Sequence, residues 1–326
     1  MAAEKMALAK AINESLRSAL ESDPKVLIMG EDVGKLGGVF RVTDGLQKDF
    51  GEDRVIDTPL AESGIIGTAI GLAMRGYRPI CEIQFDGFVY PAFDQIVSQL
   101  AKMHFRSRGT VSLPVTIRIP FGGGIGAVEH HSESPEAYFS HTAGLKVVAC
   151  SNPADGYHMI QQAVACDDPV IFLEPKRRYW EKAEVDPSLT PDPLHQARVL
   201  RTGTDLTIAA YGPMVKVALD AATAAEEDGH QLEVIDLRSL SPLDSGTVLD
   251  SVRRTGRLVV VHEAPVTLGL GSELAARVTE QAFYSLEAPV LRVGGFDTPY
   301  PPSRLEEDFL PDLDRVLDAV DRSFAY

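Results

Sequence analysis

Residues 57–67 read DTPLAESGIIG and place one carboxylate, Glu62, among small and apolar residues. The preceding residues 54–57 predict a short buried strand, and residues 62–74 predict a helix whose small residues allow close packing. Glu62 falls where the strand gives way to the helix. The positive end of the helix would hold its carboxylate, and partial desolvation would let it make one strong hydrogen bond to a ligand. The alternative is a first-turn residue that only compensates the helix dipole.

Strand and helix patterns alternate along the chain, which predicts an α/β fold of two doubly wound domains with parallel sheets. Strands of the first domain are expected at residues 26–29, 54–57, 80–85, 115–119, 146–150 and 170–173, with helices at 62–74, 91–105 and 154–165. A proline-rich connection follows, so the expected boundaries are 1–180 for the first domain, 181–198 for a linker and 199–326 for the second domain. The second domain is expected to end in one helix over residues 303–323.

Composition and charge are those of an ordinary globular chain, with 326 residues, 44% of them hydrophobic and 24% charged. A net charge of −16 argues against binding to nucleic acid or to an anionic membrane. No apolar run approaches the roughly 18 residues that span a bilayer, and the first residues lack a signal-peptide pattern, so a cytoplasmic location is expected. Three widely spaced cysteines suit a reducing compartment, as core thiols.

A glycine-rich segment, FGGGIGA at residues 121–127, nominally satisfies the G-x-G-x-x-A pattern of dinucleotide sites. That pattern requires a helix directly after the glycines, whereas the next residues predict an irregular loop, so no dinucleotide is expected. The loop continues into His130 and His131. The side chains of adjacent histidines diverge, so a metal ion shared by both is disfavoured. Proton transfer by one histidine near neutral pH is favoured. The alternative is that both histidines are polar loop residues whose hydrogen bonds are satisfied by neighbouring backbone. The aromatic cluster in residues 84–95 could lie against a planar heterocycle, although core packing is the commoner cause.

Eight ordered segments then resemble a single enzyme family: MGEDVG at 29–34, GGVF at 37–40, DTPLAE at 57–62, EIQF at 82–85, PAFDQI at 91–96, HSESPEA at 131–137, GLKVV at 144–148 and DLRSLSPLD at 236–244. The chain resembles, over essentially its whole length, the β subunit of the thiamine-diphosphate-dependent 2-oxoacid dehydrogenases. These are the decarboxylating components of the pyruvate and branched-chain complexes. The resemblance implies a pyrimidine-binding, transketolase-like domain followed by a domain similar to the transketolase C-terminal domain.

The resemblance also implies roles for individual residues. Glu62 matches the glutamate that hydrogen-bonds N1′ of the cofactor's aminopyrimidine ring and stabilises its imino form. Leu60 and Gln84 match neighbouring cofactor positions, and Phe88 matches a position that packs on the pyrimidine ring, where relatives often carry tyrosine. His131 matches the loop histidine that meets the incoming lipoyl group and assists reductive acylation by donating a proton.

Cofactor and partner expectations follow from the same resemblance. Ala163, Cys166 and Asp168 correspond loosely to a monovalent-cation site, which suggests potassium. No Gly-Asp-Gly sequence occurs in the chain, so magnesium and the diphosphate are expected to be held by an α subunit in an α2β2 heterotetramer. A lipoyl acyltransferase core is a further expected partner, through its lipoyl domain and its subunit-binding domain. The subunit-binding domain is often basic, and the acidic segment 306–321 would suit its docking. The alternative is that these acids only form a solvated helix face.

Substrate choice is decided by fewer residues. Segments 83–85, 91–96 and 134–139 look closer to branched-chain members of the family, which favours branched-chain 2-oxo acids. Pyruvate is the second candidate, because one methylene discriminates by only about 1 to 3 kcal/mol. A hypothesis of another class is a non-catalytic scaffolding subunit, in which Glu62 and His131 serve structure only.

Overall fold

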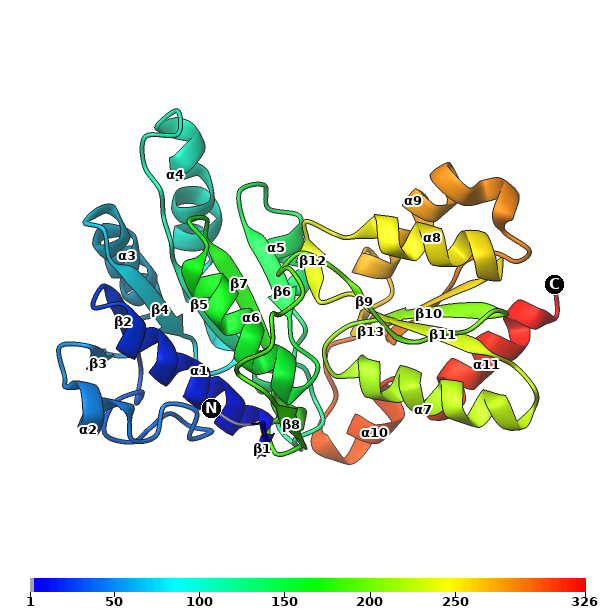
Figure 1. Ribbon diagram of the computed structural model, residues 1–326, viewed down its shortest axis with the longest axis horizontal. Helices are drawn as coiled ribbons and strands as arrows, with labels where there is room; N and C mark the ends of the chain where they lie inside the picture. Colours follow the sequence, from blue (N-terminus) through cyan, green and yellow to red (C-terminus); the bar gives the residue numbers. More distant parts are fainter. Residues whose placement is uncertain (1–2) are drawn as a thin grey trace. The chain divides into compact units, whose positions relative to one another are not determined.

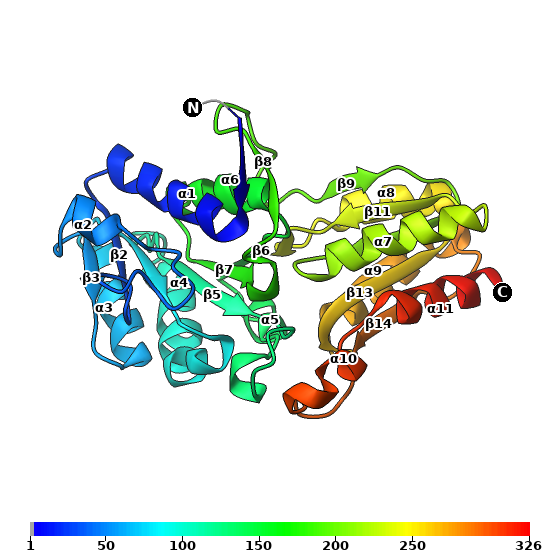
Figure 2. The same cartoon turned by 90° about the horizontal axis from the view of Figure 1, so that it is seen from below.

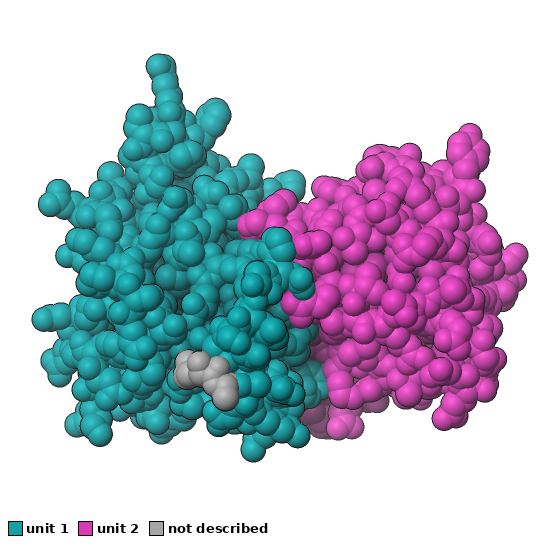
Figure 3. Space-filling view, viewed as in Figure 1, with its two compact units in different colours: residues 1–121, 138–194 teal, residues 122–137, 195–326 magenta. Residues whose placement is uncertain are grey.

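The computed structural model describes residues 3–326, and these form two compact units (Figure 3). The first unit comprises residues 1–121 and 138–194, and the second comprises residues 122–137 and 195–326. The glycine-rich loop and both histidines therefore group with the second unit. No helix in the described part of the chain is long and apolar enough to cross a membrane.

The first unit is built on a parallel sheet with the strand order β6-β7-β5-β4-β2-β3 (Figure 1). Every residue of the central strands β2, β5 and β7 is buried, as expected for a sheet covered on both faces. The strands of this sheet are β2 (Val26–Gly30), β3 (Val55–Asp57), β4 (Arg78–Glu82), β5 (Thr116–Phe121), β6 (Lys146–Ala149) and β7 (Val170–Pro175).

Helices cover both faces of this sheet (Figure 2). On one face α1 (Leu8–Ser22) packs beside α6 (Pro153–Ala165), and the apolar stripe of α1 joins a core that includes Ile160 of α6. On the other face lie α3 (Glu62–Met74) and α4 (Ala101–Arg106), together with η1 (Asp86–Ala92) and η2 (Gln95–Leu100). The remaining elements of the unit are β1 (Glu4–Ala7), α2 (Leu46–Phe50), η4 (Lys176–Arg178) and β8 (Lys182–Val185).

One expectation for the first unit was wrong in detail. The helix expected over 91–105 is three consecutive pieces, the 3-10 segment η1, the π-helical segment η2 and then α4. Pro91 lies inside the 3-10 segment, where its ring and missing N–H are incompatible with a regular α-helix interior. The proline-rich connection also contains structure, because β8 pairs antiparallel with β1. A two-stranded pair at the surface leaves no strong apolar alternation to read from sequence.

The second unit repeats the architecture with the strand order β14-β13-β10-β11-β9, in which only β9 runs antiparallel to its neighbour. Helices α7 and α11 cover one face and α8 and α9 the other (Figure 1). The strands are β9 (Arg198–Arg201), β10 (Leu206–Ala210), β11 (Leu232–Asp236), β12 (Ser239–Ser241), β13 (Leu258–Pro265) and β14 (Leu291–Gly295). The helical elements are η3 (Glu129–His131), α7 (Met214–Glu227), α8 (Ser245–Thr255), α9 (Leu270–Ala282), η5 (Phe283–Ser285), η6 (Ser303–Leu305), α10 (Glu306–Phe309) and α11 (Leu313–Phe324). Helix α5 (Glu136–Ser140) begins in the second unit and ends in the first.

The single final helix expected over residues 303–323 was also wrong. The segment breaks into η6, α10 and α11, and Leu310, Pro311 and Asp312 separate the last two. Pro311 disfavours the helical conformation at the residue before it, and the side chain of Asp312 accepts a hydrogen bond from the Arg315 amide and so starts a new helix. This break gives Glu306 its own short element.

Candidate cofactor site

Three parallel strands of the first unit end side by side, and a carboxylate or amide follows each of them. Strand β2 pairs in parallel with both β3 and β4, so the chain leaves all three at one edge of the sheet. Glu31 follows β2, Glu62 begins the helix after β3, and Gln84 follows β4. Open parallel sheets bind their ligands at this edge.

Glu62 occupies the place that the sequence predicts. It is the first residue of α3 and only 7% exposed, so the positive end of the helix faces a largely desolvated carboxylate. The residue before it, Ala61, supplies no side-chain cap. Within residues 3–326 no group donates a hydrogen bond to the Glu62 carboxylate, which leaves it able to accept one from a ligand.

A second carboxyl group, Glu31, faces Glu62. Glu31 is 9% exposed, and its Oε1 atom is buried without a hydrogen-bond partner in the described residues. Burial raises the pKa of Glu31, and repulsion from Glu62 and then Asp32 raises it further. Sequence reasoning gave Glu31 no role, although an acidic residue directly after a fully apolar strand was the available signal.

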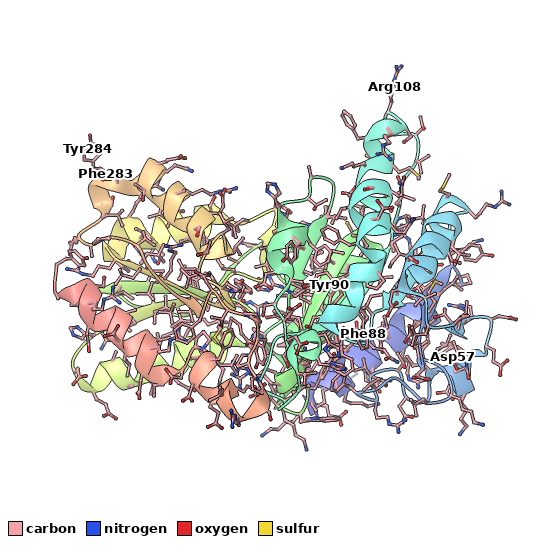
Figure 4. The ribbon with its side chains drawn as sticks, turned by 180° about the vertical axis from the view of Figure 1, so that it is seen from behind. Asp57, Phe88, Tyr90, Arg108, Phe283 and Tyr284 are labelled. Atoms are coloured by element: carbon pink, nitrogen blue, oxygen red, sulfur yellow. The ribbon has the colours of Figure 1, made fainter. Side chains whose placement is uncertain are left out.

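The other predicted cofactor residues surround the same sheet edge. Gln84 donates from Nε2 to Oδ2 of Asp32 at 3.1 Å, which fixes its amide. Leu60, two residues before Glu62, is 80% exposed, which leaves a large apolar side chain beside the carboxylate. Phe88 is half-buried and packs edge to face on Phe85 at 5.7 Å (Figure 4).

Buried ion pairs support the turn that carries Phe88. Asp86, the first residue of η1, is paired with Lys176, and both side chains are fully buried. Close by in the sheet, Arg118 donates to Glu82 and Glu174 at 2.6 Å each. Burial raises the pKa of Glu82, with the Arg118 charge opposing that rise. Nothing in the sequence pattern marked these residues as partners, because they come from elements far apart in the sequence.

These residues fit the heterocyclic half of thiamine diphosphate. An aminopyrimidine needs a carboxylate acceptor and apolar surfaces, which Glu62, Leu60 and Phe88 provide. They do not fit the diphosphate half, since the chain has no Gly-Asp-Gly sequence and its described residues contain no cluster of three histidine, cysteine or acidic side chains able to hold a metal ion.

The suggested potassium residues lie together at the end of α6, but their oxygen atoms already have partners. The Ala163 carbonyl accepts a hydrogen bond from the Cys166 amide, and the Cys166 carbonyl accepts one from Arg78 at 3.1 Å. The Asp168 carboxylate pairs with Lys146 at 3.0 Å. Each carbonyl oxygen keeps a second lone pair beside its hydrogen bond, so these contacts do not decide potassium binding, which stays an expectation.

The glycine-rich loop is a separate feature of the second unit. No helix follows its glycines directly, in agreement with the irregular loop that the sequence predicts. Its amides bind carboxylates of the protein itself: Gly123 donates to Glu263, and Gly124 and Gly126 donate to Glu306 at 2.9 Å each. These three glycine amides therefore bind side chains of the protein itself.

His130 and His131 form the 3-10 turn η3 that follows this loop. Their rings meet edge to face with centroids 4.4 Å apart, and Nδ1 of His130 lies 3.5 Å from Glu129. His130 is exposed, and His131 is half-buried. Because His131 belongs to the second unit and Glu62 to the first, the predicted catalytic residues come from different units.

Comparison with known proteins gives consistent family matches for both units. Residues 4–181 match the family model "Transketolase, pyrimidine binding domain", and residues 195–316 match "Transketolase, C-terminal domain". The chain is 66% identical to a protein of Leifsonia xyli subsp. xyli named pyruvate dehydrogenase E1 component subunit beta, covering 99% of this chain and 96% of that one. It is 58% identical to a protein of Mycobacterium tuberculosis named 3-methyl-2-oxobutanoate dehydrogenase subunit beta, covering 98% and 92%.

A solved structure agrees with the fold. The protein titled "Split gene transketolase, inactive beta4 tetramer" superposes with a TM-score of 0.82 at 25% identity, covering 98% of each chain. The predicted fold class and the predicted family are both confirmed. The chain belongs to the transketolase-like family of E1 β subunits of the 2-oxoacid dehydrogenases.

Proposed function

We propose that this chain, together with an α subunit, catalyses the thiamine-diphosphate-dependent oxidative decarboxylation of branched-chain 2-oxo acids and the reductive acylation of a lipoyl group. The single observation that supports the catalytic part is the buried Glu62 carboxylate, which has no hydrogen-bond donor within residues 3–326 and has Glu31 beside it. When bound, thiamine diphosphate would supply an acidic carbon whose carbanion adds to the 2-oxo group. The cofactor ring would then store the electron pair that carbon dioxide leaves behind.

The residues of this chain bind and orient the aminopyrimidine ring. Glu62 accepts a hydrogen bond at N1′ and favours the imino form of the ring, while Leu60 and Phe88 exclude water from its faces. Gln84, fixed by Asp32, borders the same pocket. The Glu31 carboxyl group lies near this contact, and burial, followed by the Glu62 charge, raises the pKa of Glu31.

His131 is proposed to donate a proton during acyl transfer to the lipoyl group. Its imidazole lies in a short turn on a glycine-rich loop and is half-buried, so it can reach an incoming group and still be oriented by the protein. A thiolate leaving the lipoyl disulfide needs a proton as the ring opens, and imidazole titrates in the required range. His131→Ala should slow acylation of a lipoyl domain more than reduction of an artificial electron acceptor.

An α subunit is the partner that would complete the site. It would supply the magnesium and diphosphate ligands that this chain lacks, in an α2β2 heterotetramer, so the chain alone should be inactive. Docking of a basic subunit-binding domain of the acyltransferase is proposed for the exposed acids of α11, Asp314, Asp318 and Asp321. Glu306 is excluded from this surface, because it is buried and bound to the glycine-rich loop.

Pyruvate is the second candidate substrate, and the similarity to the pyruvate dehydrogenase subunit named above favours it. The branched-chain proposal is supported by segments 83–85, 91–96 and 134–139 and by the similarity to the 3-methyl-2-oxobutanoate enzyme subunit. The deciding measurement is kcat/KM of the complex reconstituted with its α subunit for 3-methyl-2-oxobutanoate and for pyruvate. A ratio in favour of pyruvate by tenfold or more, about 1.4 kcal/mol, would overturn the branched-chain assignment.

The catalytic proposal is tested by Glu62→Gln in the reconstituted complex. The amide keeps the shape of the side chain but removes the charged acceptor, so we expect thiamine-dependent decarboxylation to fall by about 100-fold or more, with assembly unchanged. Unchanged turnover in that variant would favour the scaffolding hypothesis, in which the chain keeps the fold without taking part in the chemistry.

A further inference from the structure

The glycines of the glycine-rich loop are required by three side chains that contact it, those of Glu263, Tyr300 and Glu306. A Cβ atom on Gly123 would lie 1.8 Å from the hydroxyl oxygen of Tyr300, so only glycine fits there. A Cβ on Gly122, whose φ is +80°, would lie 2.9 Å from Oε1 of Glu263. Gly124 and Gly126 also have positive φ angles, of 84° and 72°. The loop is therefore shaped to bring its amides against these three side chains.

Glu306 makes the central contact. Its two carboxylate oxygens accept separate hydrogen bonds, Oε1 from the Gly124 amide and Oε2 from the Gly126 amide, at 2.9 Å each. The hydroxyl of Tyr300 donates to Oε1 at 2.6 Å. Burial, followed by the hydrogen bond to Glu306, raises the pKa of Tyr300, so its hydroxyl keeps the proton that it donates. Glu306 is 7% exposed, and charge-assisted hydrogen bonds of this kind are the stronger ones in proteins.

The rest of the loop is fixed at its ends. The Gly122 amide donates to the Glu133 carbonyl at 2.8 Å and closes the loop around the histidine turn. Immediately after it, Glu136 accepts a hydrogen bond from the Tyr211 hydroxyl at 2.6 Å. Between these two anchors, Glu306 holds the part of the loop that contains Gly124 and Gly126. His131 lies between the Glu306 contact and the second anchor.

The short helix that carries Glu306 is itself anchored. Phe309 packs on Tyr300 with ring centroids 5.0 Å apart, and both belong to a small apolar cluster with Leu310. The guanidinium of Arg315 donates to the Phe309 carbonyl at 3.1 Å and ties the short helix to the helix α11 that follows it. Glu306 therefore transmits the position of a packed element to the loop.

We propose that Glu306, with Tyr300, is a positioning residue for His131: it holds the glycine-rich loop so that the imidazole is correctly placed for acyl transfer to the lipoyl group. This inference rests on the proposed function of His131. Glu306 acts through the loop backbone and takes no part in decarboxylation at the cofactor, which this chain serves through Glu62 in the other unit. Loss of Glu306 should therefore affect one half of the reaction sequence and leave the other intact.

The test is Glu306→Gln in the complex reconstituted with its α subunit. The amide keeps the size of the side chain, but its NH2 group cannot accept the hydrogen bond of a glycine amide. Two rates are measured, acylation of a free lipoyl domain and reduction of an artificial electron acceptor. We expect the first to fall by about tenfold to a hundredfold, as for small misplacements of reacting groups, and the second to stay within about twofold.

A matched control is Glu307→Gln, the same change one residue along, on an exposed side chain. It should alter neither rate. Tyr300→Phe provides a milder variant in case Glu306→Gln fails to fold, because it keeps the packed ring and removes only the hydroxyl. We expect it to reduce acylation in the same selective way, by a smaller factor.

Each outcome has a definite meaning. Equal losses in both rates, or no loss in either, would overturn the positioning role. If His131→Ala slows acylation while both Glu306→Gln and Tyr300→Phe leave it unchanged, the inference fails and the proposed role of His131 stands. If His131→Ala itself leaves acylation unchanged, the proposed role of His131 fails, and the positioning role of Glu306 fails with it.

Discussion

Protonation of one buried histidine should weaken the fold in mild acid. His262 lies on β13 and is fully buried; its ring stacks on Tyr211 and its Nδ1 donates to the Ala264 carbonyl at 2.9 Å. A Cβ atom at Gly269 or Gly271 would fall within 3 Å of the imidazole, so the ring is closely enclosed. Burial is the largest cause that lowers the pKa of His262 from 6.5 to about 4.

The magnitude follows from this shift. A group whose pKa is depressed on folding contributes stability that is fully present above its unfolded pKa and is lost as the pH falls toward the folded pKa. The unfolded chain therefore takes up a proton near pH 6.5 that the folded chain takes up only near pH 4. At about 1.4 kcal/mol per pKa unit, the free energy of unfolding should fall by about 2 kcal/mol between pH 7.5 and pH 5, and by about 3 kcal/mol by pH 4.

The assay compares urea unfolding of the purified wild-type chain with that of His262→Gln at several pH values. Glutamine removes the titrating group, so the variant is less stable at pH 7.5 because of lost packing, but it should lose less stability on acidification. The difference between the two chains isolates His262 from the carboxylates that titrate in both. A difference that stays constant from pH 7.5 to pH 5, or a directly measured His262 pKa above 6, would refute the reasoning.

Three further outcomes are expected. Lys176→Met should cost about 3 to 5 kcal/mol in urea unfolding, because it removes the buried cation that pairs with the Asp86 carboxylate, and combining it with Asp86→Asn should recover much of that loss. A loss below about 1 kcal/mol would contradict the buried pair. Asp244→Ala should cost about 1 kcal/mol, because the Asp244 carboxylate caps α8 by accepting from the Thr247 amide, and a melting temperature equal to wild type would contradict the cap. Leu60→Asp should change the free energy of unfolding by less than about 0.5 kcal/mol, because the side chain is 80% exposed. It should nevertheless weaken thiamine diphosphate binding in titrations of the reconstituted complex, and an unchanged affinity would remove Leu60 from the pocket.

The sequence predicted most of the parallel framework. Strands β2 and β6 came within one residue of their expected bounds and helix α3 matched its bounds, because buried parallel strands are continuous apolar runs. The failures occurred where local features departed from the pattern. The π-helical segment η2 interrupted the helix expected over residues 91–105, and Pro311 with the Asp312 cap ended one helix and began another.

The candidate site was predictable only where the chemistry is local. Glu62 could be placed from its position between a strand and a helix, and the structure leaves its carboxylate buried and accessible to a ligand. Glu31 could not, because its raised pKa arises from burial and then from Glu62 at the start of α3, and both depend on the fold. The partners Lys176 and Asp86 are 90 positions apart in sequence, and no pattern in a single sequence reports such a pair.

The glycine-rich loop shows why a motif alone cannot identify its ligand. Closely spaced glycines expose backbone amides, and exposed amides bind anions, whether these are phosphates or carboxylates. In this chain the anions are Glu263 and Glu306, which follow the loop by more than 130 positions and reach it only through the fold. A glycine motif therefore predicts an anion, and the surrounding structure decides which one. Here the protein supplies its own, so the loop is suited to hold a neighbouring side chain in place and not to bind a nucleotide.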